Sequence, residues 1–153
     1  MSKTGWLRVL VGGALWAAVY NSVWGIAWFT FMRQEWLRAT ASIDQALPWT
    51  PHFWAVWIPM TIPLGVAIMA YLASRPKCTA IPRAVLAASL VLWVPGTVGM
   101  AAWTWQESLP ARIIALDSSV DLVAVIVASF VGSWSLRAHA MGATDDHPAN
   151  ALQ

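Results

Sequence analysis

The sequence predicts an all-α integral membrane protein, a bundle of four transmembrane helices with both termini in the cytoplasm. Of its 153 residues, 59% are hydrophobic and only 10% are charged, whereas a soluble domain carries about 25% charged residues. The charges lie between four long uncharged stretches, and the chain holds 12 tryptophans, a residue that favours membrane interfaces. This composition excludes a disordered chain and a nucleic-acid-binding domain, and the single cysteine, Cys78, excludes a disulfide framework.

Three of the uncharged stretches are long enough to cross a bilayer directly. They cover residues 9–32, 53–74 and 84–106, and each exceeds the ~20 residues that span a ~30 Å hydrocarbon layer. Each must be helical, because lipid offers no partner to free backbone groups. The first stretch is longer than the ~7–15 apolar residues of a cleavable signal peptide, so we expect it to stay in the membrane.

The fourth stretch is too short on its own. Residues 122–136 carry no charge, but at ~1.5 Å per residue they form a helix only about 22 Å long. The fourth helix must therefore extend back to about residue 113 and take Asp121, and with it Asp117, into the span. Together the four spans make one domain, residues 1–140, and the polar residues 141–153 are predicted to be a disordered tail.

Basic residues set the expected orientation. Six of them lie on one side of the predicted bundle, in the N-terminal segment, in the loop between the second and third helices and at the end of the fourth helix: Lys3, Arg8, Arg75, Lys77, Arg83 and Arg137. Three lie in the two loops on the other side: Arg33, Arg38 and Arg112. Since cytoplasmic segments are enriched in Lys and Arg, this bias places both termini inside.

Two rows of residues, each spaced by four positions, run along the first helix. One row consists of small residues and the polar Asn21: Gly13, Ala17, Asn21 and Gly25. The other row is aromatic: Trp16, Tyr20, Trp24 and Trp28. A small row lets helices approach closely. Asn21 lies near mid-membrane, where it either joins two helices by a hydrogen bond or contacts a ligand. The tryptophans either pack and anchor at the interface, as we expect for Trp36, Trp49, Trp54, Trp103 and Trp105, or line a binding site.

Prolines interrupt the second and third helices. Pro59 and Pro63 lie in the second, and Pro95 lies in the third. A proline removes one helical hydrogen bond and kinks the helix. Pro63 and Pro95 fall near the midplane, level with Asn21, so their kinks either open a cavity between the two helices or simply shape the bundle.

Asp117 and Asp121 are the sharpest candidates for a functional site. They are spaced i, i+4 and share a face with the small residues Ala124, Ala128 and Gly132. Counted back from Arg137 at ~1.5 Å per residue, Asp121 lies about 6 Å inside the hydrocarbon, where ionisable groups are generally functional. Asp117 is either a buried carboxyl or the N-cap of a helix that starts there. Arg112, Arg33 and His52 are the expected partners.

Several short motifs resemble the DUF1761 family, small bacterial four-helix membrane proteins of unknown function. They cover about residues 6–136 and comprise Gly25-Ile26-Ala27-Trp28-Phe29 with Trp36, Leu92-Trp93, Glu107-Ser108-Leu109-Pro110, Ile114-Ala115-Leu116-Asp117 and Gly132-Ser133-Trp134. The resemblance implies a four-helix fold in the bacterial cytoplasmic membrane and carries no activity with it.

Three functions stay open at this point. The first is a non-enzymatic protein that binds a hydrophobic small molecule in its bundle, or serves as a homo-oligomer or a subunit of a membrane complex. The second is a small proton-coupled transporter that uses Asp121. The third is an enzyme acting on a lipid-phase substrate, although the sequence offers no nucleophile–base pair, metal cluster or cofactor loop. We therefore expect the bilayer as a partner and no metal or cofactor.

Overall fold

The computed structural model describes residues 3–41, 50–75 and 81–137, and all regular structure in these ranges is helical. The elements are α1 (Lys3–Ala27), η1 (Trp28–Met32), α2 (Arg33–Ala41), α3 (Pro51–Ser74), α4 (Ile81–Gln106) and α5 (Ala111–Arg137). Four helical segments are long and apolar enough to cross a membrane: Gly5–Ala41, Pro51–Ser74, Pro82–Gln106 and Ala111–Leu136. This confirms the predicted all-helical fold and suggests a multi-pass membrane protein. The predicted tail, residues 141–153, and Trp49 lie outside the described residues.

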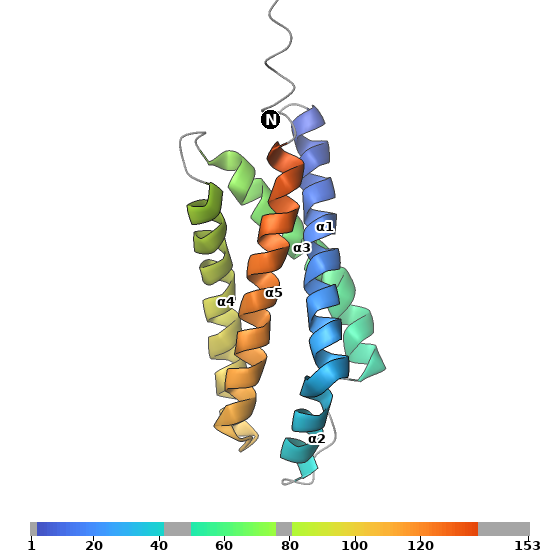
Figure 1. Cartoon of the computed structure of the whole chain (residues 1–153), viewed down its shortest axis with the longest axis vertical. Coiled ribbons are helices and arrows are strands. Elements are labelled where there is room, and N and C mark those ends of the chain that lie inside the picture. Colours follow the sequence, from blue (N-terminus) through green and yellow to red (C-terminus); the bar gives the residue numbers. More distant parts are fainter. Residues whose placement is uncertain (1–2, 42–49, 76–80, 138–153) are drawn as a thin grey trace, which may run out of the picture.

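The helices α1 and α5 form the central pair of the bundle. They pack against each other along most of their length, α3 packs on α1, and α4 packs on α5 (Figure 1). Helix α3 crosses the bundle obliquely, so its first turns diverge from the last turns of α4 and these two helices hardly touch. The neighbours of α3 and α4 are therefore mainly the central pair.

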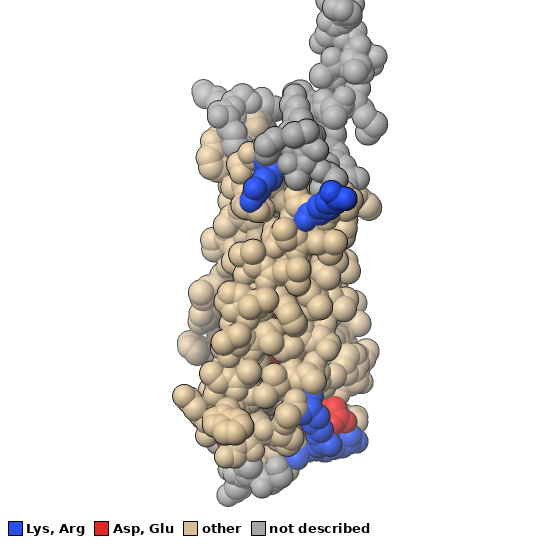
Figure 2. Space-filling model, turned by 90° about the vertical axis from the view of Figure 1, so that its left-hand side faces the viewer, with Lys and Arg blue, Asp and Glu red and all other residues tan. Residues whose placement is uncertain are grey.

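The outer surface is apolar between two charged ends. Figure 2 shows Lys and Arg near both ends of the molecule and an uncharged band between them. Large apolar side chains point outward within this band, such as Phe29, Val91 and Val98, each more than half exposed. An apolar surface band of this kind is what a helix bundle presents to lipid.

Close contact between α1 and α3 depends on glycine. A Cβ atom added to Gly13 would lie 2.6 Å from the backbone nitrogen of Val66 and 2.7 Å from its Cα atom. Contacts this short do not occur, so only glycine allows the two backbones to approach here. The small row predicted for the first helix is therefore a packing surface at this point.

The first helix does not end where its apolar stretch ends. We expected it to stop at residue 32, but it continues through η1 and α2 to Ala41. Charge at Arg33 and Glu35 ends the apolar span without ending the helix, because both residues are good helix formers and no Pro or Gly follows before position 42.

The π-helical turn η1 keeps one face of this long helix buried. In an α-helix, residues spaced by four drift about 40° per step around the axis, so a row this long would rotate out of the core. A π-turn absorbs one extra residue. As a result the whole row is buried: Trp16, Tyr20, Trp24, Trp28, Met32 and Trp36.

Helix α5 begins well before the two aspartates. Ser108 takes a left-handed conformation (φ 57°), Leu109 N–H donates to the carbonyl of Thr104 at 2.9 Å, and α5 starts at Ala111. This turn resembles a Schellman C-cap, with Leu109 buried beneath it. Asp117 is thus inside the helix and not its N-cap, which confirms that the fourth helix extends back beyond Asp121.

Candidate functional site: a cavity lined by all four long helices

A cavity of about 280 Å³ lies between the helices and is lined by side chains of α1, α3, α4 and α5. The lining residues from α1 and α5 are mostly buried, whereas those from α3 and α4 are partly exposed. The cavity is therefore closed by the central pair and reaches the surface between α3 and α4. Its lining consists of Tyr20, Trp24, Phe53, Trp54, Trp57, Leu64, Leu92, Gly96, Thr97, Met100, Asp117, Ser118, Asp121 and Val125.

Aromatic rings from the start of α3 form one wall. Phe53 stacks on Trp57 with ring centroids 5.8 Å apart and meets Trp54 edge-on at 5.3 Å. Trp54 in turn contacts Trp28 of η1 edge-on at 6.2 Å. Thr50 caps α3 by accepting a hydrogen bond from the backbone N–H of Phe53, which fixes the turn that carries these rings. The wall is consequently preformed and apolar.

Asp121 belongs to the polar part of the cavity lining. The hydroxyl of Tyr20 donates a hydrogen bond to its Oδ1 atom at 2.6 Å, and the indole N–H of Trp24 donates to the same atom at 3.2 Å. Both donors come from the aromatic row of α1. Two neutral donors thus hold the carboxyl across the α1–α5 contact. Its other oxygen, Oδ2, lies near α4, 3.9 Å from a Cβ atom added at Gly96.

Asp117, one turn earlier, is the more deeply buried carboxyl. It is only 3% exposed, and the indole N–H of Trp36 is its side-chain partner. Its Oδ1 atom has no hydrogen bond of standard geometry to the described residues, and the same is true of two hydroxyls that line the cavity, Ser118 Oγ and Thr97 Oγ1. Buried polar atoms of folded proteins almost always have partners. All three residues line one cavity, so hydrogen-bonding capacity that the described residues leave unused is concentrated around it.

The prolines of α3 and α4 face away from this cavity. Pro59, Pro63 and Pro95 lie inside their helices, and their side chains are exposed. The residues that follow two of them, Leu64 and Gly96, line the cavity instead. The cavity thus lies between the two proline-containing helices, at the level of Pro63 and Pro95.

Of the residues singled out in the sequence, Asp117, Asp121 and Trp24 line the cavity. Trp28 packs behind the aromatic wall on Trp54. Asn21 lies elsewhere: its Nδ2 atom donates to Thr61 Oγ1 at 2.8 Å and to the Ala17 carbonyl at 2.8 Å, so it joins α1 to α3.

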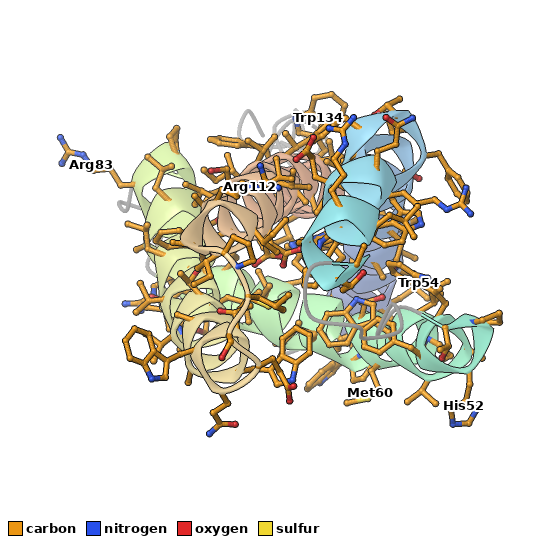
Figure 3. The ribbon with its side chains drawn as sticks, turned by 90° about the horizontal axis from the view of Figure 1, so that it is seen from below. His52, Trp54, Met60, Arg83, Arg112 and Trp134 are labelled. Carbon is orange, nitrogen blue, oxygen red and sulfur yellow. The ribbon has the colours of Figure 1, made fainter. Side chains whose placement is uncertain are left out.

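The expected cationic partners do not reach the carboxyls. Arg112, Arg33 and His52 are exposed, and Figure 3 shows His52 pointing away from the bundle, well apart from Arg112. Arg112 precedes Asp117 by five positions, which turns it about 140° around the helix. It cannot share the inward face of α5.

Sequence reasoning did not single out Tyr20, Phe53, Trp57, Gly96 and Thr97 as site residues. Tyr20 had a signal, because it occupies the aromatic row between Trp16 and Trp24. The others had none, because their place in the cavity depends on the oblique path of α3 and on the face of α4 that turns toward α5.

Comparisons of the chain with protein-family models, with curated proteins and with solved structures give no match. The resemblance to the DUF1761 family stays a prediction. No group of three His, Cys, Asp or Glu side chains suited to a metal ion occurs in the parts of the chain that the structure describes.

Proposed function

We propose that the protein is a non-enzymatic, multi-pass membrane protein that binds a hydrophobic small molecule in the cavity between α3 and α4. The observation that carries this proposal is the cavity of about 280 Å³ with a preformed aromatic wall. Small-molecule sites are typically concave, mostly apolar and equipped with a few placed polar groups. This cavity likewise combines an apolar, aromatic wall with a few polar groups, among them Asp117 and Asp121.

The route to the cavity supports a ligand that dissolves in lipid. Its partly exposed lining comes from α3 and α4, two helices that are apolar enough to cross a bilayer. A molecule within the hydrocarbon layer would enter sideways between them. The distribution of Lys and Arg favours an orientation with both termini inside, and the resemblance to the DUF1761 family implies a bacterial cytoplasmic membrane.

A pair of glycines on α4 offers the test. Gly96 lines the cavity, whereas Gly99, one turn on, has nothing within 4 Å of an added Cβ atom. Gly96→Leu would fill the cavity, and Gly99→Leu adds the same side chain to the outer surface. Both variants make the same change in helix propensity and hydrophobicity.

The measurement is fluorine NMR of the protein in lipid nanodiscs with three aromatic probes of one size. They are para-fluoropropylbenzene, para-fluorophenethylamine and para-fluorohydrocinnamate, which are neutral, cationic and anionic at pH 7. We expect at least one probe to give a bound resonance in the parent and in Gly99→Leu but not in Gly96→Leu. Absence of a bound resonance for all three probes, or an unchanged one in Gly96→Leu, contradicts the proposal.

A second candidate, a proton-coupled carrier, is favoured by one observation. Asp121 is an ionisable group that lines the cavity, and its hydrogen-bond donors among the described residues are the neutral Tyr20 and Trp24, so a proton or a cargo can compete for it. In proteoliposomes, Asp121→Asn should abolish any pH-dependent uptake of a probe that the parent transports. Uptake that is equal in the parent and in Asp121→Asn rules out this role.

A further inference from the structure

We infer that the ligand of this cavity carries a protonated amine, which Asp117 and Asp121 hold while the aromatic wall receives its apolar part. The inference rests on the proposed function and names the chemical class of the molecule bound. Three observations carry it: the charge balance of the lining, the polar atoms left without partners, and the position of the rings.

The charge balance is one-sided. Among the described residues that line the cavity, the ionisable groups are Asp117 and Asp121 from α5 and Tyr20 from α1, and α3 and α4 contribute none. No Lys, Arg or His belongs to this lining. Buried carboxyls are generally paired with a positive charge. The described lining supplies none, so a cation from outside is the matching partner.

The unsatisfied polar atoms specify the kind of cation. Asp117 is 3% exposed and Ser118 is 9% exposed, yet Asp117 Oδ1 and Ser118 Oγ have no hydrogen bond of standard geometry to the described residues, and neither has Thr97 Oγ1 on the facing helix α4. All three are hydrogen-bond acceptors. An ammonium group presents three donors and no acceptor, so a primary amine suits a lining rich in acceptors, whereas a quaternary ammonium has no N–H to donate.

The rings lie where the remainder of such a molecule would extend. Phe53, Trp54 and Trp57 line the cavity from α3, whereas the carboxyls line it from α5, and the indole N–H of Trp24 donates to Asp121. Indole and phenyl faces attract cations as well as apolar groups. The cavity therefore matches an aromatic or alkyl amine with its ammonium group toward α5.

The three probes separate this inference from the proposed function. In the parent protein we expect para-fluorophenethylamine to give a bound resonance and para-fluorohydrocinnamate, which carries a carboxylate in place of the ammonium, to give none. Equal affinity of the amine and the carboxylate overturns the inference and leaves the proposed function intact. If none of the three probes binds, the result contradicts both this inference and the proposed function.

Substitutions of the two aspartates give a second, independent test. Asp117→Asn and Asp121→Asn should each weaken binding of the amine by about tenfold or more, since each removes a charge-assisted hydrogen bond. The control is Glu107→Gln, which removes the same charge at the end of α4, away from the cavity. Amine binding that is unchanged in both aspartate variants contradicts the inference. Should either variant fail to fold, the comparison of amine and carboxylate in the parent decides alone.

The amine has two possible sources, a free amphiphile or the headgroup of an aminophospholipid. Nanodiscs of phosphatidylcholine contain no primary amine, and nanodiscs with added phosphatidylethanolamine do. Displacement of para-fluorophenethylamine by phosphatidylethanolamine assigns the site to the lipid headgroup. Binding that is equal in both nanodiscs assigns it to a free amine.

Discussion

The hydroxyl of Tyr20 donates a hydrogen bond of 2.6 Å to Oδ1 of Asp121, a residue 101 positions away in the sequence. The contact joins the two central helices at the edge of the cavity. Tyr20 is 4% exposed and also stacks on Trp16, whose ring centroid lies 5.0 Å away. Trp16 makes a similar link one turn earlier, through a hydrogen bond of 2.9 Å from its indole N–H to Ser129 Oγ. A row of aromatic donors on α1 thus fixes its register against α5.

Tyr20→Phe should destabilise the protein by about 1–3 kcal/mol, because it leaves a buried carboxyl short of one donor while it preserves the ring and its packing. The measurement is the free energy of unfolding in mixed micelles. Tyr71→Phe is the control, since Tyr71 is 37% exposed on the outer face of α3. If Tyr20→Phe and Tyr71→Phe are equally stable, the Tyr20–Asp121 bond does not hold the central pair.

Removing the exposed charges at the end of the bundle should leave the cavity unaffected. Arg112→Gln and His52→Gln remove the residues that the sequence suggested as partners of the carboxyls, but both side chains are exposed, and exposed charges act weakly over distance. We expect amine-probe affinity in fluorine NMR titrations to stay within about twofold of the parent. A tenfold loss in either variant would show that the substituted residue does act on the site.

The number of long apolar helices and the place of both aspartates inside the fourth helix could be predicted, because both follow from where charges lie along one chain. The shortness of the uncharged stretch before Arg137 required α5 to include Asp121, and α5 does begin at Ala111. The spacing of four placed Asp117 on the same face of α5 as Asp121 but left open whether it is a buried carboxyl or an N-cap, and only the start of α5 at Ala111 decides this.

The partners of the carboxyls could not be predicted, because they depend on which helices meet. Spacing placed Tyr20 and Trp24 on one row of α1 and left open whether that row faced lipid, α3 or α5. The oblique path of α3 brings Phe53 and Trp57 to the cavity, and the sequence has no signal for a crossing angle. The continuation of the first helix to Ala41 was missed for another reason: Arg33 ends the apolar stretch, and a charge does not end a helix.

Gly13→Ala should destabilise the bundle, and Gly25→Ala should not. A methyl group at Gly13 would lie 2.6 Å from the backbone nitrogen of Val66, so α1 and α3 must separate, which costs about 1–3 kcal/mol for overpacking. At Gly25 nothing lies within 4 Å of the added atom, and alanine is the better helix former by up to about 1 kcal/mol. Unfolding free energies in mixed micelles compare the two variants. Equal stability of both would show that α1 and α3 do not pack closely at Gly13.

Asn21 should prove to be a structural link between two helices and not a ligand contact. Its Nδ2 atom donates to Thr61 Oγ1 on α3 at 2.8 Å, and Thr61 is buried. A double-mutant cycle with Asn21→Leu and Thr61→Val isolates this bond from the other effects of each substitution. Hydrogen bonds between membrane helices contribute about 0.6 kcal/mol on average and up to about 1.7 kcal/mol, so we expect a coupling energy in that range. Because neither residue lines the cavity, probe affinity should be unchanged in both single variants. A coupling energy near zero, together with lost probe binding in Asn21→Leu, would instead make Asn21 a ligand contact.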